Sequence, residues 1–555
     1  MSIEELSKTG AVDQFRANAQ PLDSTAIKPA RLGLWISSAW LQTAGLVSLT
    51  VVSSVLLSVS LPPYDFGGLA WFALAPLFFA LRRASAPAAL GLSALFGALF
   101  GMQAFSWLKT LPGVSLPSYL FMVFAFNLYF LVFGFLYRRF RLHHGWWLLL
   151  TAPALWVSLE FIRSNLGFLS LPWNLVGHSQ YRYVSILQMV AFTGVSGLSF
   201  LIIMMNQALS EFPGWLIERN RHSVSHRGRS DCRLIQFSIA VILLLAALGY
   251  GRYCLMNQEA TGTLRVALVQ ANVLAREGMS DLEQVAHLRA YQQLNEQAAT
   301  FAPDLIVWPS TSLPSGMSSS RLVNLMVRRM ASASGAYVLV GGAGGEKFQP
   351  KRDGYLNYSN SEFLVSPGGE LKGQYNKMLL LPFNEYLPLR GYVSWPSWIT
   401  TLRNSFEPGI DYRLFEVSGA RFGAPICWEN LFADHFRQFV KTGAHFMVSA
   451  TNEGFFGHST GPFQTLAMNV FRAAENRVTV VRASTTGISA FISSSGEILD
   501  HVSDMQGNVL FVSGFLIRDI PLATTRTFYT LYGDIFAYLF MAIAIGGAIL
   551  TMRRQ

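Results

Sequence analysis

The sequence contains few charged residues. Asp, Glu, Lys and Arg make up 13% of its 555 residues, whereas hydrophobic residues make up 51%. About a quarter of the residues in an ordinary soluble domain are charged, so this composition excludes that class and indicates a membrane protein. The formal net charge is +10, and in a membrane protein such an excess usually reflects Lys and Arg gathered on the cytoplasmic side. We therefore expect no nucleic-acid surface.

Cysteine is also scarce. The three cysteines, Cys232, Cys254 and Cys427, lie far apart in the sequence, which argues against a disulfide framework and against a cysteine-based metal site. The ten histidines show no HExxH or comparable ligand spacing, so we expect no metal. The first thirty residues lack the apolar core of a signal peptide, and we interpret residues 1–33 as a cytoplasmic tail.

Long uncharged apolar segments are abundant. Eight of them are close to the length that a helix needs to cross a bilayer, about 20 residues. They lie at 34–60, 66–81, 88–108, 117–137, 145–162, 185–206, 234–254 and 528–550. The second is short, and the fifth carries Glu160 near one end. The sequence thus predicts an α-helical membrane domain with seven spans in residues 34–257 and an eighth span in residues 528–555.

Basic residues in the connectors predict the orientation. They precede the first span, follow the second and the fourth, separate the sixth from the seventh, and end the chain; Arg82, Arg83 and the segment RRFRLHH at 138–144 are examples. Because Lys and Arg gather in cytoplasmic connectors, we expect these segments and both termini to face the cytoplasm. Residues 258–527 are then extracytoplasmic.

This large insert has a different sequence pattern. Short β-branched runs lie at 264–272, 305–309, 336–342, 421–428, 445–450 and 477–484, and amphipathic patterns lie between them at 280–300, 319–334, 430–442 and 462–476. Apolar residues in the amphipathic segments recur every three and four residues, as in helices. The turn sequences SPGGE at 366–370 and SSSGE at 493–497 predict hairpins. We predict one α/β domain with a mixed sheet covered on both faces.

Cys427 ends the apolar run of the stretch FGAPICWENLF at 422–432. A lone cysteine is usually a small buried hydrophobe, so core packing is one interpretation. Catalytic groups, however, are often displayed at the ends of strands in α/β folds. A thiol becomes a nucleophile when a cation lowers its pKa or when a base takes its proton, and a lysine and an acid must then lie nearby.

The stretch GQYNKMLLLPFNEYLP at 373–388 contains both groups. Lys377 follows a strand-like run, and Glu385 lies in a loop bounded by prolines. Each alone is commonly a solvated surface charge. Among apolar neighbours, an ammonium at this position could instead stabilise a thiolate and the oxyanion of a tetrahedral intermediate.

Five stretches, in this order, resemble the nitrilase superfamily: LRVALVQANV, LIVWPSTSLP, YNKMLLLPFNEYLP, GAPICWENLF and TNEGFFGHSTGPFQTLAMNVFRAAENR. Together with the spans and the stretch LPPYDFGGLAWFALAPLFFAL at 61–81, they make nearly the whole chain similar to the bacterial apolipoprotein N-acyltransferases. The resemblance implies an α-β-β-α sandwich in the periplasm on a multi-pass anchor in the inner membrane. It also implies a catalytic Glu, Lys and Cys, in which Cys427 is the nucleophile, Lys377 stabilises the oxyanion and Glu385 is a further acid.

The sequence departs from this family at one catalytic position. Members carry a glutamate after Trp-Pro as general base, whereas this chain has Ser310 in VWPSTSLP. A hydroxyl is no base near neutral pH, and loss of a positioned base typically lowers a rate by a factor of about 10² to 10⁴. Three explanations stay open. Glu385 or Glu429 takes the proton, Lys377 alone holds the thiolate, or the protein is a weak or silent relative.

The resemblance further implies a two-step transfer without a cofactor. Cys427 attacks an ester carbonyl of a phospholipid and forms a thioester, which the α-amino group of a diacylglyceryl-modified N-terminal cysteine of a lipoprotein then attacks. A monomer is expected. Two rival functions are a paralogue that binds lipid or lipoprotein without turnover, and an amidase- or nitrilase-type hydrolase that uses water as the acceptor.

Other polar and aromatic residues are expected to contact substrate. The tryptophans of RGYVSWPSWITTLRN at 390–404 either pack in a core or form a lid that dips into the outer lipid surface. Glu160 and Arg163 form either an ion pair at a helix end or an entrance for lipid headgroups. The full set of predicted substrate contacts is Trp428, Glu429, Tyr386, Trp395 and Trp398.

Overall fold

The computed structural model describes residues 31–553, apart from 112–113, 220–223, 258–261, 277, 318, 345–358, 398, 401 and 403–404. Most of the predicted N-terminal tail, and Trp398, therefore lie outside the described residues. The chain divides into two units, residues 1–48 and residues 49–555. Helix α2 (Arg31–Val59) runs from the first into the second, and all contacts described below lie within the second unit.

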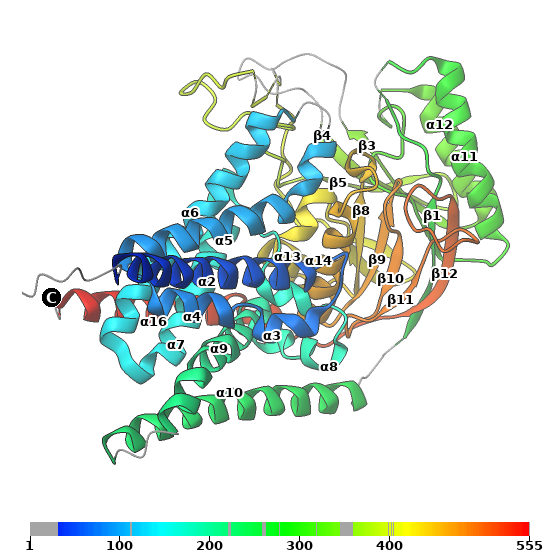
Figure 1. The fold of residues 1–555 in the computed structure, drawn as a ribbon. Coiled ribbons are helices and arrows are strands. Elements are labelled where there is room, and N and C mark those ends of the chain that lie inside the picture. The colour runs from blue at the N-terminus through cyan, green and yellow to red at the C-terminus, as the bar shows by residue number, and fades with distance from the viewer. Residues whose placement is uncertain are drawn as a thin grey trace, which may run out of the picture. The chain divides into compact units, whose positions relative to one another are not determined.

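The chain before the large insert is helical, and Figure 1 shows the order of its elements. The helices are α2, α3 (Ala70–Ala73), α4 (Ala75–Arg83), α5 (Ala86–Ala104), α6 (Leu116–His144), α7 (Leu148–Ser164), α8 (Val184–Leu187), α9 (Val190–Arg219) and α10 (Val224–Met256). Two more, α15 (Phe528–Tyr532) and α16 (Ile535–Arg553), follow the insert. Within the described residues, six helices are long and apolar enough to cross a membrane, namely α2, α5, α6, α9, α10 and α16.

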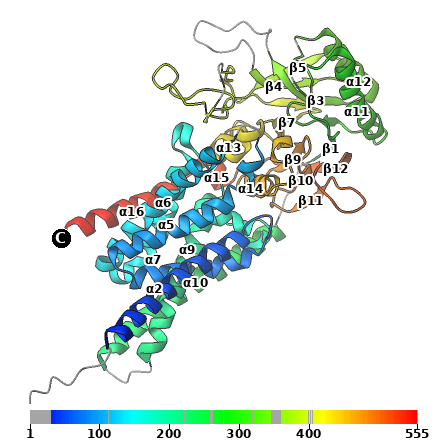
Figure 2. The same ribbon diagram turned by 45° about the horizontal axis from the view of Figure 1, so that its top comes forward.

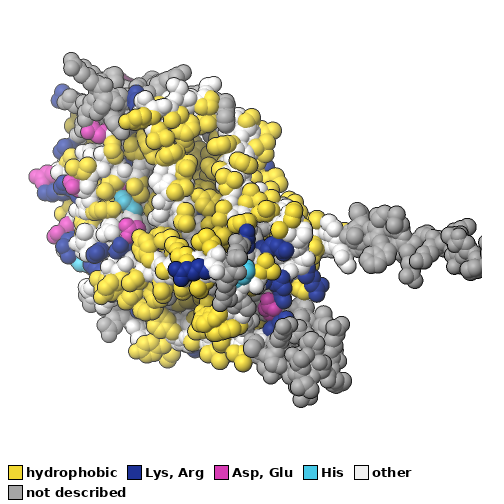
Figure 3. Space-filling view, turned by 90° about the vertical axis from the view of Figure 1, so that its left-hand side faces the viewer, with side chains coloured by type: hydrophobic (Ala, Val, Ile, Leu, Met, Phe, Trp, Pro, Cys, Tyr) yellow, Lys and Arg dark blue, Asp and Glu magenta, His cyan; other side chains and the backbone are white. Residues whose placement is uncertain are grey.

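The outward faces of these helices are apolar. Helix α6 exposes Phe124 and Phe135, and α10 exposes Ile242 and Leu245. Hydrophobic side chains also cover much of the face that Figure 3 displays. A soluble protein rarely exposes so much apolar surface, whereas a bilayer solvates it. The composition-based prediction of a membrane protein agrees with this surface.

The predicted second span, at 66–81, is not one continuous helix. Pro76, in the first turn of α4, has no N–H to continue the helix from α3, and the chain breaks between them. The side chain of Asn206 on α9 supplies hydrogen-bond partners for the backbone groups at this break. Its oxygen accepts from the N–H groups of Leu74 at 2.7 Å and Ala75 at 3.0 Å, and its amide donates to the carbonyl of Ala70 at 2.8 Å. Neighbouring protein thus replaces the hydrogen bonds that lipid cannot supply.

Two other predicted spans differ from the helices observed. The fifth, at 145–162, corresponds to α7, which has 17 residues. The eighth, at 528–550, is divided by Gly533, whose φ of 64° separates the short α15 from α16. The last long helix therefore begins at Ile535.

Basic residues from several helices meet at one end of the helical bundle. Arg82, at the end of α4, forms an ion pair of 2.6 Å with Glu211 on α9. Arg233 of α10 lies 3.3 Å from the same carboxylate. Arg141, at the end of α6, donates to the backbone carbonyl of Arg82 at 2.6 Å. The ends of α4, α6 and α9 and the start of α10 consequently share one side of the bundle.

The insert contains two six-stranded sheets rather than the single mixed sheet that the residue pattern indicated. The first has the order β12 (Gly514–Pro521), β1 (Thr263–Gln270), β2 (Leu305–Val307), β3 (Tyr337–Gly344), β4 (Ser359–Val365), β5 (Leu371–Asn376). The second has the order β11 (Ile498–His501), β10 (Ala490–Ile492), β9 (Thr479–Ser484), β8 (Phe446–Thr451), β7 (Ala420–Gly423), β6 (Phe415–Val417). Both hairpins predicted from the turn sequences are present, between β4 and β5 and between β10 and β11.

Helices cover the outer face of each sheet. Helices α11 (Asp281–Ala299) and α12 (Arg321–Ser334) pack on the first sheet, and α13 (Ala433–Lys441) and α14 (Gly461–Asn476) on the second. Figures 1 and 2 show the resulting order of helix, sheet, sheet and helix. Val340 and Phe363 of the first sheet belong to the core beneath α11 and α12. Alternate residues of the same strands therefore face the second sheet.

Side chains fix this α/β domain to the helical bundle. Trp173, in the loop after α7, donates its indole N–H to Gln464 of α14 at 2.6 Å. The hydroxyl of Thr110 donates to the carbonyl of Phe456 at 3.0 Å. Near the start of α9, the N–H of Val195 donates to Glu475 of α14 at 3.3 Å. Helix α14 is thus held between the bundle and the second sheet.

Candidate active site

Cys427 occupies a tight turn between the two sheets. It follows β7 and begins a 3-10 helix, η7 (Cys427–Leu431), with a φ of 51°. This left-handed conformation is uncommon for a residue with a side chain and is often found at functional sites. The preceding residue, Ile426, pairs with Ala450 of β8, so the turn is anchored on the sheet while the Cys427 side chain is only partly buried.

Lys377 and Glu385 form a buried ion pair. The Nζ atom of Lys377 lies 2.8 Å and 2.7 Å from the two carboxylate oxygens of Glu385. The N–H of Leu381 also donates to this carboxylate at 2.7 Å, as does the side chain of Asn360 at 3.4 Å. The structure therefore brings together two residues that the sequence placed in one loop, and it holds the ammonium in a fixed position.

The electrostatics of this pair favour a charged lysine close to the thiol. Burial alone would lower the pKa of Lys377, but the Glu385 carboxylate and the negative form of Cys427 outweigh burial and raise that pKa above its ordinary value. An ammonium that remains charged beside Cys427 stabilises a thiolate and a developing oxyanion.

Glu429, which the sequence suggested as a substrate contact or substitute base, is fully buried and already hydrogen-bonded. Its oxygens accept from the N–H groups of Ile426 at 2.7 Å and Met378 at 2.6 Å, and from the Tyr375 hydroxyl at 2.9 Å. Burial would raise the pKa of Glu429, but His435 and the backbone N–H donors outweigh it and lower the pKa. This carboxylate joins the Cys427 turn to β5 and to the backbone directly after Lys377.

Ser310 lies three residues after the end of β2 and is fully buried. Within the described residues its hydroxyl has no hydrogen-bond partner. The next residue, Thr311, has a φ of 53° and accepts a hydrogen bond of 2.7 Å from Asn452, which follows β8. The Ser310 turn thus reaches toward the strand ends of the second sheet, where Cys427 also lies.

Glu362 was missed by the sequence analysis. It lies on β4, opposite Gly341 of β3 and Tyr375 of β5. Its carboxyl is fully buried, and neither oxygen has a hydrogen-bond partner within the described residues. Burial raises the pKa of Glu362 well above its ordinary value. The only signal in the sequence is an acid inside the strand-like run SNSEFLV, which would need the strand register to be interpreted.

The predicted aromatic substrate contacts have different surroundings. Trp428 is partly buried and packs edge-on against Phe432, with ring centroids 5.1 Å apart. Tyr386 is partly buried in the loop of Glu385. Trp395 is also partly buried, and its indole N–H donates to the carbonyl of Pro388 at 2.7 Å. Among the described residues of the 390–404 region, Tyr392 and Val393 are large apolar side chains that are exposed.

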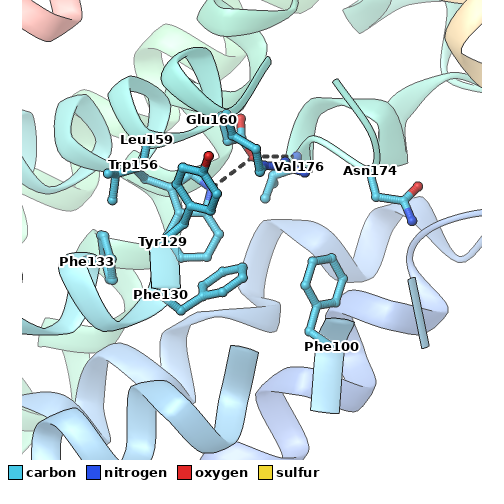
Figure 4. Close-up of a pocket in the computed structure, with 10 residues that line it drawn as sticks. Phe100, Tyr129, Phe130, Phe133, Trp156, Leu159, Glu160, Asn174 and Val176 are labelled. Atoms are coloured by element: carbon cyan, nitrogen blue, oxygen red, sulfur yellow. Dashed lines mark hydrogen bonds between the residues drawn. The ribbon is translucent and has the colours of Figure 1, made fainter. Parts of the chain in front are cut away.

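Glu160 and Arg163 do not form a close ion pair with each other; each is hydrogen-bonded to other residues. Glu160 accepts from the indole of Trp156 at 3.0 Å and from the N–H of Val176 at 2.8 Å (Figure 4). Arg163 donates to the carbonyl of Trp173 at 2.7 Å. The pocket beside them has a volume of about 20 Å³, which holds about one water molecule. Both residues hold the loop after α7 against the bundle.

A larger cavity of about 230 Å³ lies where the bundle meets the α/β domain. Glu160 and His178 line it from the bundle, and Leu379, Leu431 and Arg472 line it from the α/β domain. Leu379 and Leu431 are close in sequence to Lys377 and Cys427. Within the described residues, no group of three or more His, Cys, Asp or Glu side chains is arranged to hold a metal ion.

Comparison with protein families assigns both halves of the chain. Residues 53–208 match the apolipoprotein N-acyltransferase N-terminal domain, and residues 265–529 match the carbon-nitrogen hydrolase domain. The apolipoprotein N-acyltransferase of Geobacter metallireducens is 32% identical over 518 residues, which cover 91% of this chain and 95% of that relative. The chain belongs to the apolipoprotein N-acyltransferase family. The family predicted from the sequence motifs is therefore confirmed, and with it an acyltransferase rather than a binding-only paralogue.

More distant relatives share the same description. Apolipoprotein N-acyltransferase 1 of Treponema denticola is 26% identical and aligns with 90% of this chain and 94% of its own length. The relative from Chlorobaculum tepidum is 27% identical over 89% of this chain and 94% of its own. Among solved structures, a nitrilase-superfamily amidase from Nesterenkonia aligns with 48% of this chain and 94% of its own, with 18% identity and a TM-score of 0.35. The family assignment comes from the sequence matches.

Proposed function

We propose that this protein transfers a fatty acyl chain from a membrane phospholipid to the α-amino group of a lipoprotein's diacylglyceryl-modified N-terminal cysteine. The observation that carries the proposal is the position of Cys427 in a strained turn beside the buried Lys377–Glu385 ion pair, in a chain of this family. Cys427 attacks the ester carbonyl and forms a thioester, and the lipoprotein amine then attacks the thioester and forms an amide.

The residues of the site have separate roles in this proposal. Lys377 stabilises the Cys427 thiolate and the oxyanion of both tetrahedral intermediates. Glu385 positions the ammonium through its two short contacts. Glu429 holds the turn of Cys427 against β5. Trp428, Tyr386, Trp395 and Trp398 are proposed to contact the acyl donor or the acceptor.

We further propose that eight segments cross the membrane, including α7 and the broken pair α3 and α4. Residues 1–33 and the end of the chain then face the cytoplasm, residues 34–257 form the membrane domain, and residues 258–527 form a periplasmic domain. Helix α9 supports this orientation. Val195 near its start contacts the α/β domain, and Glu211 contacts the basic cluster 16 residues later, a rise of about 24 Å. That distance approaches the thickness of a hydrocarbon core, about 30 Å.

This arrangement suits a reaction between two lipids. The acyl chains of donor and acceptor remain in the bilayer, while the reacting carbonyl and amine reach a site held directly on the bundle through Trp173 and Gln464. The proposed enzyme acts as a monomer in the inner membrane, since all of the proposed catalytic groups come from one chain.

The test uses purified full-length protein mixed with phosphatidylethanolamine vesicles. Mass spectrometry of the peptide that contains Cys427 is expected to show an acyl adduct, and Cys427→Ala is expected to abolish it. Cys254→Ala, a change at a buried cysteine of α10, is the matched control and should retain the adduct. Absence of an adduct on the unmodified protein would contradict the proposal.

A second stage identifies the acceptor. Addition of a synthetic diacylglyceryl-cysteine peptide should discharge the adduct and yield an N-acyl peptide. Release of free fatty acid at the same rate with and without the peptide would instead identify a hydrolase that uses water.

A further inference from the structure

A buried carboxyl, without a hydrogen-bond partner in the described part of the chain, lies on the face of the first sheet that points toward the second sheet, the sheet from which the Cys427 turn extends. Glu362 is paired directly opposite Gly341 and Tyr375, and directly opposed residues of antiparallel strands project to the same face. Val340 and Phe363, the neighbours of this row, pack beneath the helices α11 and α12. Gly341, Glu362 and Tyr375 therefore face the other way, toward the second sheet.

Two small residues leave room for this carboxyl. A Cβ placed on Gly341 would lie 2.7 Å from the Oε1 atom of Glu362 and 2.6 Å from the Cα atom of Ser310. The Glu362 carboxyl therefore lies beside the backbone of Ser310, in space that a side chain at residue 341 would fill. A serine is short enough not to compete for that space, whereas a glutamate at residue 310 would place a second carboxyl there.

The same face leads to the nucleophile. Lys377 lies two residues after Tyr375, the partner of Glu362, and so projects to the same side. The Tyr375 hydroxyl donates to Glu429 at 2.9 Å, and Glu429 is two residues from Cys427. Glu362 is thus part of one row of side chains that ends at the Cys427 turn.

The other two acids of this row have partners. Glu385 binds the ammonium of Lys377 through both oxygens. Glu429 accepts from backbone N–H groups and from Tyr375. Within the described residues, Glu362 is the acid of this row whose two oxygens both lack a hydrogen-bond partner, and so it is the one free to exchange a proton.

We infer that Glu362 is the general base of the acyl transfer, supplied from β4 in place of the acid that the chain lacks at Ser310. This inference rests on the proposed function. The Glu362 carboxylate takes the proton of the Cys427 thiol as the sulfur bonds to the ester carbonyl carbon. When the intermediate collapses, the ester C–O bond breaks and Glu362 returns that proton to the leaving oxygen, which gives a lysophospholipid hydroxyl. In the second half Glu362 takes a proton from the attacking amine, the C–S bond breaks, and the proton returns to the sulfur.

The environment of Glu362 suits this role. Burial raises the pKa of Glu362 well above its ordinary value, so this carboxylate binds a proton more strongly than the carboxylate of an exposed glutamate does. The titratable groups on the elements packed around this row are Tyr375 on β5, Lys377 directly after β5, and Cys427 and Glu429 on η7, whereas the residue opposite Glu362 on β3 is Gly341. Because only the carboxylate accepts a proton, the reaction should accelerate as pH rises through the pKa of Glu362.

The first test compares two isosteric substitutions. Glu362→Gln should slow formation of the acyl adduct by a factor of about 10² to 10⁴. Glu370→Gln, at an exposed ion pair with Lys372 in the adjacent hairpin, is the control and should react at the unmodified rate. The double variant Glu362→Gln with Ser310→Glu restores a carboxyl from the Ser310 position. It should form the adduct at least tenfold faster than Glu362→Gln alone. Ser310→Glu alone should not accelerate the reaction, because it crowds a second carboxyl into the same space.

The second test needs no lipid and therefore separates this inference from the proposed function. Alkylation of Cys427 by iodoacetamide is followed by peptide mass spectrometry from pH 5 to 10. Glu362→Gln should slow alkylation near neutral pH and move its midpoint toward that of an ordinary thiol. A normal profile in Glu362→Gln, with an unchanged adduct rate, would overturn the inference and leave Lys377 as sufficient to hold the thiolate.

The remaining outcomes are also decisive. If the unmodified protein forms no adduct but the alkylation profile still shifts in Glu362→Gln, the proposed function fails and the base assignment stands. If Glu362→Gln does not fold, Glu362→Asp is used instead. Aspartate keeps the carboxylate, but its side chain is one methylene shorter. That variant should react at least tenfold more slowly, and an unmodified rate would overturn the inference.

Discussion

At the scale of single residues, the Lys377–Glu385 pair contributes to both stability and chemistry. Each side chain is at least nine-tenths buried, so removing one partner leaves an uncompensated charge in the interior. Because this pair is both buried and close to Cys427, its catalytic and its structural contributions need to be separated by experiment.

We predict that Lys377→Met lowers the free energy of unfolding by about 3–5 kcal/mol. The double variant Lys377→Met with Glu385→Gln should regain most of that loss, because neither charge is then unpaired. Both variants should nevertheless form the acyl adduct about 10²-fold more slowly or worse. Thermal unfolding in detergent and adduct rates measure the two effects. Lys372→Met, at an exposed lysine, is the control, and a double variant with unmodified activity would refute the role of the ammonium.

At the residue level, short motifs pointed to Cys427 and Lys377, whereas strand pairing was needed to find Glu362. Cys427 ends an apolar run, Lys377 follows a strand-like run, and in the structure the two side chains interact electrostatically. Glu362 stands in the middle of a strand, where an acid ordinarily faces solvent. Only the register that opposes it to Gly341 shows that this acid faces inward, and register depends on partners distant in sequence.

At the scale of elements, breaks in the helices matter as much as the helices. Helix α9 contains a kink at Gly194, with φ 64° and ψ −179°, a conformation that is essentially restricted to glycine. The ring of Tyr529 from α15 packs into the space, 2.7 Å from where a Cβ would lie. The kink therefore forms the contact between α9 and the segment that returns the chain to the membrane.

We predict that Gly194→Ala lowers the free energy of unfolding by about 1–3 kcal/mol. Both the backbone strain and the clash with Tyr529 act in this direction, and thermal unfolding in detergent measures their sum. Gly91→Ala is the matched control, since it lies on α5 with no atom within 4 Å of its added Cβ. A control and variant with equal transition temperatures would show that the kink tolerates a side chain.

Hydropathy located the long helices but not their interruptions. The segments that form α5, α6 and α10 are apolar enough to be predicted as membrane-spanning helices from hydropathy alone. The backbone groups at the break between α3 and α4 are hydrogen-bonded by Asn206, more than a hundred residues away in the sequence. In the α/β domain the four helices α11 to α14 were predicted, but the eight-residue strand β12 was not. The division into two sheets follows from pairings between distant segments.

At the scale of the whole protein, the proposed topology makes a prediction that can be checked in cells. In a chain whose native cysteines are replaced, Gln506→Cys in an exposed turn of the α/β domain should react with a membrane-impermeant maleimide on intact spheroplasts. Ser85→Cys, in the exposed connector between α4 and α5, should react only after lysis, because that connector lies beside the basic cluster. The reverse pattern would invert the orientation.

The link between the bundle and the α/β domain consists of packed side chains. The indole of Trp173 stacks near Trp107, with ring centroids 4.7 Å apart, and donates to Gln464 on α14. In the proposed topology, these contacts fix the height of the Cys427 sulfur above the hydrocarbon core of the membrane. Donor lipids would then be sorted by how far their ester must climb out of the leaflet, a vertical criterion that acts before any recognition of the headgroup.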